Sequence, residues 1–199
     1  MIADTGVRVE KSGPAQKAYN LRRTECETAF SKVVEKVMSA QLARTTPSGY
    51  PDLLRQLGRE RVMTVAEDVL DGNLLRRFRH VVTEARRVDE AVDRLRSADL
   101  AGFGTLMDAS HGSLRTDFLM SSRELDELTA IAREGGAVGA RLTGAGLGGC
   151  IVALTDRHHA DGVVRTLAKD YYGPRKLPGR IEARVFVAEP SAGASVRAL

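Results

Sequence analysis

The chain has 199 residues, of which 43% are apolar and 28% are charged, and its formal net charge is +4. This balance is typical of a globular protein and excludes a disordered or fibrous one. No stretch approaches the roughly 20 uncharged apolar residues that a membrane-spanning helix needs, and the start of the chain, Met1-Ile2-Ala3-Asp4, shows no secretory signal, so we expect a cytoplasmic protein without membrane contact.

The first two-thirds of the chain have mainly helical patterns. A short strand at the start, with Ile2, Val7 and Val9, precedes a helix from about Gln16 to Leu42. The apolar positions of that helix recur every three or four residues and share one face. They are Ala29, Val33, Val37 and Ala40. The segment from Thr45 to Pro51 contains proline and glycine and is predicted to break the helix.

Four further helices are predicted, at about Val62–Leu70, Leu74–Leu95, Ala101–Leu114 and Arg123–Glu134. The second has the clearest pattern, an apolar stripe with arginine and glutamate opposite. Its members are Leu74, Phe78, Val81, Val82, Ala85, Val88, Val92 and Leu95.

The last third changes character. Residues 138–143 and 150–155 are strand-like, Val163–Tyr172 is helical, and Ile181–Val187 alternates like a final strand, while the tail from residue 188 to 199 offers one more edge strand. The order predicts the α+β class, with an antiparallel sheet covered by helices in a single domain over residues 1–199.

The net positive charge raises the question of nucleic-acid binding. Arginines cluster at Arg76-Arg77-Phe78-Arg79 and Arg86-Arg87, but the acidic residues Glu84, Asp89 and Glu90 are interleaved with them. Trp is absent and aromatic residues make up only 5% of the chain, so a stacking platform for bases is poorly supplied. We interpret this region as a solvated helical surface and expect no nucleic-acid partner.

The glycine-rich segment between the two strands is the most informative one. Gly144, Gly146 and Gly149 satisfy G-x-G-x-x-G, but a β-branched run beginning at Cys150 follows where a dinucleotide fold needs a helix. A Walker A loop is excluded because no Lys-Ser or Lys-Thr follows the glycines. The segment alone leaves open a purely structural glycine hairpin packed against a neighbouring domain.

Several separated segments together carry a resemblance over nearly the whole chain. They are Tyr19–Glu27 with the pattern Tyr-x-x-Arg-Arg-x-x-Cys-Glu, Arg79–Arg87, Phe103–Met107 with Ser110–Arg115, Ser121–Asp126 and Gly139–Cys150. The last is similar to the third motif of the GHMP kinases, and the combination resembles galactokinases. One departure is Ser121-Ser122-Arg123, where that family commonly has Ser-Cys-Pro, which leaves the serine available to cap the following helix.

The resemblance implies a ferredoxin-like C-terminal domain that shares a cleft with an N-terminal domain and takes part in phosphoryl transfer from MgATP to the 1-hydroxyl of galactose. It implies that Tyr19 contacts the sugar; a packing role for Tyr19 remains the alternative. It also implies that a glycine-rich loop lines the cleft and steadies the phosphate-binding loop of the other domain. The residues of this loop are Thr143, Gly144, Ala145, Gly146, Leu147, Gly148 and Gly149.

Two arginines of the same segment have competing interpretations. Arg22 and Arg23 could add positive potential near phosphates, but ion pairs with Glu25 and Glu27 on the helix surface are the favoured reading.

The groups that galactokinases use for chemistry have no counterpart in this sequence. In that family the sugar-recognition signature, the Gly-Leu-Ser-Ser-Ser phosphate loop and the catalytic Asp with its Arg lie in the N-terminal half. We therefore predict no catalytic and no metal-binding residue in this chain, and expect ATP and Mg²⁺ only in the complete enzyme. The chain alone is expected to be inactive, and we interpret it as a truncated reading frame, an expressed domain or half of a split enzyme.

Substitutes for the missing groups fail on spacing. Asp108, Asp117 and Asp126 are predicted to face solvent or to cap helices. The pair His158-His159 reads as a surface turn without a third ligand, and Ser110-His111 are neighbours that cannot face each other on a helix. Cys26 and Cys150 are too few for a disulfide framework and are predicted to be buried, reduced thiols.

The expected partners are the missing N-terminal galactokinase domain and galactose. Apolar surface around the glycine loop would be exposed without that domain, which favours a homodimer or another concealing contact. An alternative hypothesis is a non-catalytic galactokinase-like protein that senses sugar or regulates a partner. Sugar preference is not encoded here, since N-acetylgalactosamine kinases resemble galactokinases closely.

Overall fold

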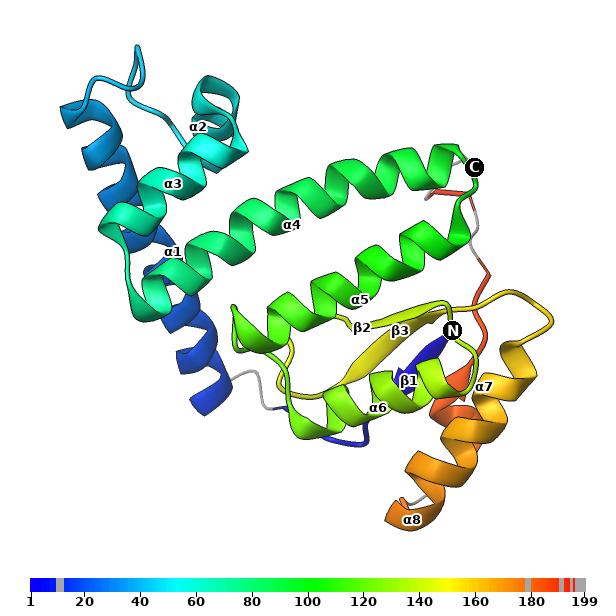
Figure 1. Ribbon diagram of the computed structural model, residues 1–199. Helices are drawn as coiled ribbons and strands as arrows, with labels where there is room; N and C mark the ends of the chain where they lie inside the picture. The colour runs from blue at the N-terminus through cyan, green and yellow to red at the C-terminus, as the bar shows by residue number, and fades with distance from the viewer. Residues whose placement is uncertain (10–12, 178–179, 190–191, 194, 196–199) are drawn as a thin grey trace.

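The computed structural model describes residues 1–9, 13–177, 180–189, 192–193 and 195 (Figure 1). In chain order the elements are β1 (Ile2–Asp4), α1 (Pro14–Ser39), α2 (Tyr50–Leu57), α3 (Arg59–Val69), α4 (Gly72–Arg96), α5 (Leu100–Thr116), α6 (Arg123–Glu134), β2 (Gly139–Leu142), β3 (Cys150–Leu154), α7 (Ala160–Thr166), the π-helical segment η1 (Leu167–Tyr172), α8 (Gly173–Arg175), the 3-10 turn η2 (Ile181–Ala183) and β4 (Val185–Phe186). None of the helices described is long and apolar enough to cross a membrane.

The strands form one antiparallel sheet in the order β2-β3-β1-β4. Strand side chains alternate between the two faces, and the buried set packs on α6, α7 and η1. On the strands this set consists of Ala3, Ala140, Leu142, Ile151 and Ala153, and the helices meet it with Leu125, Leu128, Val163 and Leu167. The predicted α+β class, with an antiparallel sheet and packed helices, is confirmed.

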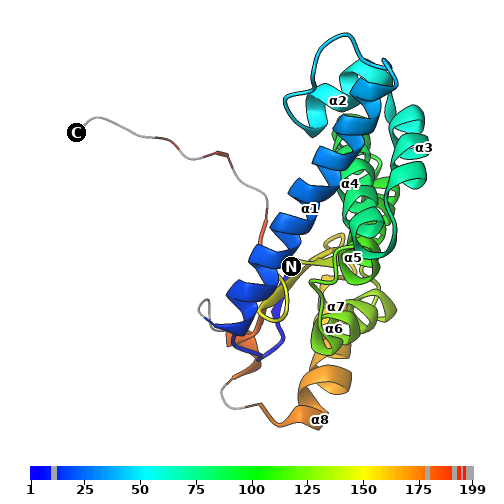
Figure 2. The ribbon, with the colours of Figure 1, turned by 90° about the vertical axis from the view of Figure 1, so that its left-hand side faces the viewer.

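A second apolar core lies away from the sheet. It unites α1, α2, α3 and the first half of α4 through residues that include Ala29, Val33, Val37, Leu53 and Phe78. Figures 1 and 2 show this helical layer at one end of the molecule and the sheet with α6 and α7 at the other. The first half of helix α4 belongs to the helical layer, and the helix also packs beside α5.

The predicted apolar stripe of α4 is buried only along its first half. Phe78 and Val82 are buried, but Val88, Val92 and Leu95 are 59%, 42% and 64% exposed. A stripe predicts a buried face only where a partner lies alongside, and the helical layer ends before these residues. The opposite, charged face was also predicted to be solvated, yet Arg77 and Arg87 are buried.

Other differences from the sequence analysis have local causes. The segment predicted to break α1 contains the start of α2, because Pro51 lies in the first helical turn, where its missing N–H costs nothing. Ala40 lies just beyond the end of α1 and is exposed. The predicted strand Ile181–Val187 is reduced to Val185–Phe186 after the turn η2. Most of the tail for which an edge strand was proposed lies outside the described residues.

Helix α5 and strand β2 approach each other backbone to backbone. A Cβ on Gly104 of α5 would overlap the carbonyl group of Val138, and one on Gly139 of β2 would overlap the backbone of Gly104. Side chains are therefore excluded from this contact, which holds α5 against the sheet.

Two glycine-to-alanine substitutions in α5 should distinguish the cost of overlap at this contact from the gain in helix propensity that alanine brings. Gly104→Ala should lower the free energy of unfolding by about 1–3 kcal/mol, because the methyl group has no space. The matched change Gly112→Ala, where a Cβ would meet nothing within 4 Å, should raise it by about 0.5–1 kcal/mol. Urea denaturation measures both, and equal effects of the two changes would contradict the packing argument.

Candidate functional site

The glycine loop and Tyr19 line the same cavity, which has a volume of about 470 Å³. Four stretches of chain form its walls: the segment after β1, the first turns of α1, the connection between α5 and α6, and the hairpin between β2 and β3. The lining residues are Val7, Arg8, Val9, Ala15, Gln16, Tyr19, Met120 and Thr143–Gly149. The loop predicted from its glycines is thus next to the tyrosine predicted from a distant segment.

The hairpin is held by backbone hydrogen bonds at its base and on one side. The Leu147 amide donates to the carbonyl of Met120 at 2.9 Å, and the Gly149 amide donates to Val7 at 3.1 Å. Gly146 has a φ of +82°, and a Cβ there would overlap the Met120 carbonyl oxygen. Two independent reasons therefore require glycine here: the positive φ, and the close approach of the Met120 carbonyl.

The segment after β1 is fixed by two buried tyrosines. The hydroxyl of Tyr171 donates to the carbonyl of Thr5 at 3.0 Å, and that of Tyr172 donates to Asp4 at 2.7 Å. Burial raises the pKa of Tyr171 to about 12, so this hydroxyl keeps its proton at any physiological pH. The wall that Val7 and Val9 give to the cavity is therefore anchored in the core of the sheet.

Tyr19 differs from the other three tyrosines of the chain. Tyr50, Tyr171 and Tyr172 each donate their hydroxyl to a backbone carbonyl. Tyr19 is 50% exposed. Among the described residues its hydroxyl has no hydrogen-bond partner. A half-exposed tyrosine with a free hydroxyl can bind a ligand, and it can also pack against a second domain.

The two arginines after Tyr19 make the ion pairs favoured by the sequence. Arg22 contacts Glu25 at 3.2 Å, and the exposed Arg23 contacts Glu27 at 2.9 Å. Glu25 also accepts from the fully buried Arg77 of α4 at 2.7 Å, which the sequence pattern did not reveal. Glu25 therefore ties α1, the helix that carries Tyr19, to α4.

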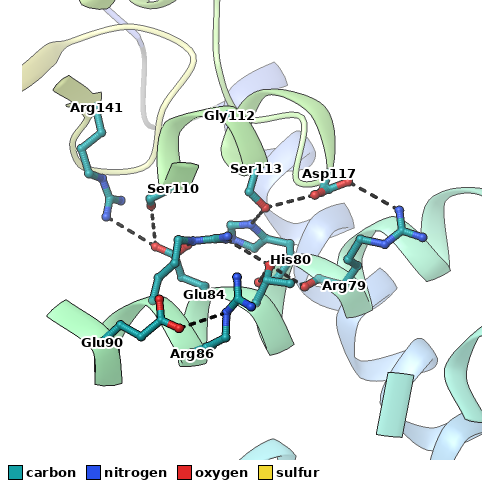
Figure 3. A network of polar contacts seen from close by, with 12 residues as sticks. Arg79, His80, Glu84, Arg86, Glu90, Ser110, Gly112, Ser113, Asp117 and Arg141 are labelled. Carbon is teal, nitrogen blue, oxygen red and sulfur yellow. Dashed lines mark hydrogen bonds and ion pairs between the residues drawn. The ribbon is translucent and has the colours of Figure 1, made fainter. Parts of the chain in front are cut away.

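A polar network fills the space between α4 and α5 (Figure 3). The Ser113 hydroxyl donates to the Asp117 carboxylate at 3.1 Å, and its oxygen lies 2.9 Å from Nδ1 of His80. Because the serine proton is used by the carboxylate, Nδ1 of His80 must carry the ring proton and donate it. His80 also stacks on Phe118, and burial lowers its pKa to about 4.

Glu84 is the other centre of this network. It accepts from Ser110 at 2.5 Å and from Arg87 at 2.7 Å, and Arg141 of β2 lies 3.5 Å away (Figure 3). Burial alone would raise the pKa of Glu84, but these hydrogen bonds and positive charges lower it below its usual value. Through Arg141, the network reaches the strand that leads into the glycine loop.

Of the three aspartates predicted to face solvent or to cap helices, Asp117 does lie at the C-cap of α5, whereas the other two have tertiary partners. Asp108 accepts from the Ala140 amide at 2.8 Å and pairs with Arg133. Asp117 accepts from Ser113, and Asp126 lies 3.2 Å from Nε2 of His111. For Asp108 and Asp126 the prediction was wrong, because helix spacing shows which residues share a face but not which other element lies against that face.

The predictions for the serine and the three histidines agree with the structure, whereas the two cysteines are less buried than predicted. Ser110 and His111 do not face each other, since Ser110 bonds to Glu84 and His111 bonds to the β2 backbone. His158 and His159 lie on an exposed turn. Cys26 and Cys150 are free thiols but only partly buried, and burial raises the pKa of both.

The donor set of the cavity suits a neutral polar ligand. Its polar side chains are Arg8, Gln16, Tyr19 and Thr143, and none of its lining residues is a carboxylate. Arg8 is already paired with Asp4. Nowhere in the described ranges do three His, Cys, Asp or Glu side chains gather closely enough to hold a metal ion. Hydroxyl, amide and apolar groups of this kind can orient a sugar.

The chain is similar to one part of known galactokinases. Residues 73–173 match the family of GHMP kinases, C-terminal domain. A galactokinase of Fusobacterium nucleatum is 34% identical over 195 residues, which cover 98% of this chain and 46% of the relative. A galactokinase of Streptococcus thermophilus is 38% identical over 161 residues, covering 79% of this chain and 38% of the relative.

A solved structure agrees with these relatives. The crystal structure of Lactococcus lactis galactokinase complexed with galactose matches with a TM-score of 0.70 and 28% identity, and the match covers 89% of this chain and 42% of that one. The chain spans less than half the length of each of these three relatives.

The glycines of the hairpin should differ in their tolerance of a methyl group. Gly144→Ala introduces only the strain of a positive φ, about 1–2 kcal/mol, because a Cβ there meets nothing within 4 Å. Gly146→Ala adds an overlap with Met120 and should cost at least 1 kcal/mol more. Thermal or urea unfolding compares them, and equal losses would contradict the close approach at Gly146.

His80 should make the protein less stable in mild acid. Its pKa is about 4 when folded and about 6.5 when unfolded, so the unfolded chain binds more protons between these values. The free energy of unfolding should therefore fall as the pH falls from about 6.5 to 4, by up to roughly 3 kcal/mol.

Unfolding curves of His80→Gln over this pH range test that expectation. The variant should have a flatter pH dependence than the parent, whereas His158→Gln, at an exposed position, should keep the parental slope. Because burial also lowers the pKa of His111, some acid sensitivity should persist in His80→Gln. Parallel curves for parent and His80→Gln would refute a neutral, buried His80.

Proposed function

The chain belongs to the GHMP kinases, whose C-terminal domain it matches, and we propose from this premise that it is the C-terminal part of a galactokinase, where it forms one wall of the sugar site. The complete enzyme would transfer a phosphoryl group from ATP to galactose and yield galactose 1-phosphate. The observation that carries the proposal is the cavity in which Tyr19 meets the loop Thr143–Gly149.

Tyr19 is the residue that we propose contacts the sugar. Its free hydroxyl can donate to one sugar oxygen and accept from another, while its ring offers an apolar surface to the sugar C–H groups. The tyrosine projects from the first turns of α1, and Glu25 ties that helix to the buried Arg77. A rigid helix therefore supports the contact, which is the condition for accurate substrate positioning.

The glycine loop is proposed to receive the domain that binds the nucleotide. Thr143, Gly144 and Ala145, the first three residues of the loop, are exposed, and Gly144 has open space around its Cα. Backbone without side chains lets a second loop come close, and exposed amides can hydrogen-bond to it or to a phosphate.

ATP and Mg²⁺ do not fit the residues of this chain. The cavity offers no carboxylate, and no cluster of metal-ligating side chains exists in the described ranges. We therefore propose that an N-terminal domain holds MgATP and supplies the catalytic groups, and that this chain alone does not phosphorylate galactose. On this proposal the chain binds and orients the sugar and shields it from water.

A chimera tests the proposal. The N-terminal part of the Lactococcus lactis galactokinase, joined to this chain where the two align, should phosphorylate galactose with ATP, and each part alone should not. A folded chimera that binds ATP but leaves galactose unchanged would refute the proposal. Galactose binding by the chain, without turnover in the chimera, would favour the alternative of a sugar-sensing or regulatory protein.

Tyr19→Phe should weaken galactose binding in that chimera. Loss of one hydrogen bond to an uncharged ligand should raise the KM for galactose about 3- to 10-fold and change kcat less than twofold. The control is Tyr50→Phe, which removes a buried hydroxyl that donates to Cys26 and should lower stability while leaving the KM unchanged. Steady-state kinetics with varied galactose distinguish the two, and a KM that stays constant in Tyr19→Phe would assign Tyr19 to packing.

A further inference from the structure

Strand β2 lies at one edge of the sheet that the described residues form, and it pairs on one side with β3. In an antiparallel pair, every second residue points its amide away from its partner strand. Thr143 donates to Cys150 of β3, so the alternate residues Ala140 and Leu142 direct their amides outward. Both residues are buried, and water does not satisfy these amides.

Two side chains of α5 accept hydrogen bonds from these amides. The Ala140 amide donates to Oδ1 of Asp108 at 2.8 Å, and the Leu142 amide donates to Nδ1 of His111 at 3.3 Å. Asp108 and His111 are three residues apart, which puts them on one face of the helix. The helix therefore replaces a neighbouring strand with two side-chain acceptors at the spacing of alternate strand residues.

Each acceptor is itself held by α6. Asp108 contacts Arg133 at 3.2 Å. His111, which is 4% exposed, lies 3.1 Å from the hydroxyl of Thr129 and 3.2 Å from the carboxylate of Asp126, both through Nε2. Because Nδ1 accepts from Leu142, the proton of the neutral ring is on Nε2, where both neighbours can accept it.

We propose that Asp108 and His111 are positioning residues for the glycine loop. Leu142 is the last residue of β2, and the loop begins with the next residue, Thr143. Fixing the Leu142 amide fixes the direction in which the loop leaves the strand and thus its distance from Tyr19. The consequence for sugar binding rests on the proposed function, whereas the effect on the strand does not.

Amide hydrogen exchange of the chain, resolved by residue with NMR, tests the effect on the strand. His111→Leu should speed exchange of the Leu142 amide about tenfold or more after correction for intrinsic rates. His111→Gln, whose side-chain oxygen can accept the same bond, should restore most of the protection. The amide of Ala153, which donates to Met1 in the sheet interior, is the internal control and should change less than twofold.

A second pair of variants keeps the test valid if His111→Leu does not fold. Asp108→Leu should expose the Ala140 amide to exchange, and Asp108→Asn, which retains an acceptor oxygen, should protect it. The proposal is overturned if Leu142 or Ala140 stays protected in the leucine variants, or if the amide of Ala153 loses protection equally. Continued protection of Leu142 or Ala140 would show that the side chain does not hold the amide. Equal loss at Ala153 would show that the substitution loosens the whole sheet.

Kinetics of the chimera test the consequence for the loop. His111→Leu should raise the KM for galactose about tenfold, with His111→Gln within twofold of the parent. A chimera that is inactive with the parental chain refutes the proposed function but leaves the exchange result to decide on Asp108 and His111. An active chimera in which His111→Leu exposes the Leu142 amide without changing the KM would overturn their role in positioning the loop.

Discussion

The backbone contact between Gly104 and Gly139 is the constraint on which the site depends. Because neither residue has a side chain, α5 comes close enough to β2 to cover the edge of the sheet. Helices that cover a strand edge protect it from pairing with other chains. Here the same approach brings Asp108 and His111 within hydrogen-bonding distance of the strand that carries the glycine loop. A larger side chain at either glycine would separate the helix from the strand and leave buried amides unpaired.

Three of the segments that bear the family resemblance meet in the polar network between α4 and α5. His80 and Glu84 come from α4, Ser110 and Ser113 from α5, and Arg141 from β2 (Figure 3). A buried polar network of this kind adds little net stability compared with apolar packing, but it loses much when one member is removed. The network joins α4 to α5 and, through Arg141, to β2. The cavity lies between α1, which contributes to the helical core, and the hairpin of β2 and β3, whose strands contribute to the other core.

The sequence predicted those features that depend on local chemistry. The hairpin followed from four glycines between two apolar, strand-like runs, and Ser122 caps α6 as its residue type indicated. The contacts of Asp108, Asp126 and Arg77 were not predictable, because each depends on a partner distant in the chain. The exposed end of α4 has the same cause: Val88 continues the periodic pattern of Phe78, but the pattern does not record where the packing partner ends.

The glycines of the loop bear on the choice between a structural hairpin and a hairpin shaped for a partner. Contacts within the chain account for Gly146, which approaches Met120, and for Gly148, which approaches Val7 and Val9. Gly144 and Gly149 also have positive φ, yet a Cβ on either would meet nothing within 4 Å. A hairpin that served only its own domain would need small residues where it packs, and Gly144 lies instead in the exposed first part of the loop. The positive φ by itself favours glycine at Gly144, and the open space around this residue leaves room for the second surface that we propose comes close to the loop.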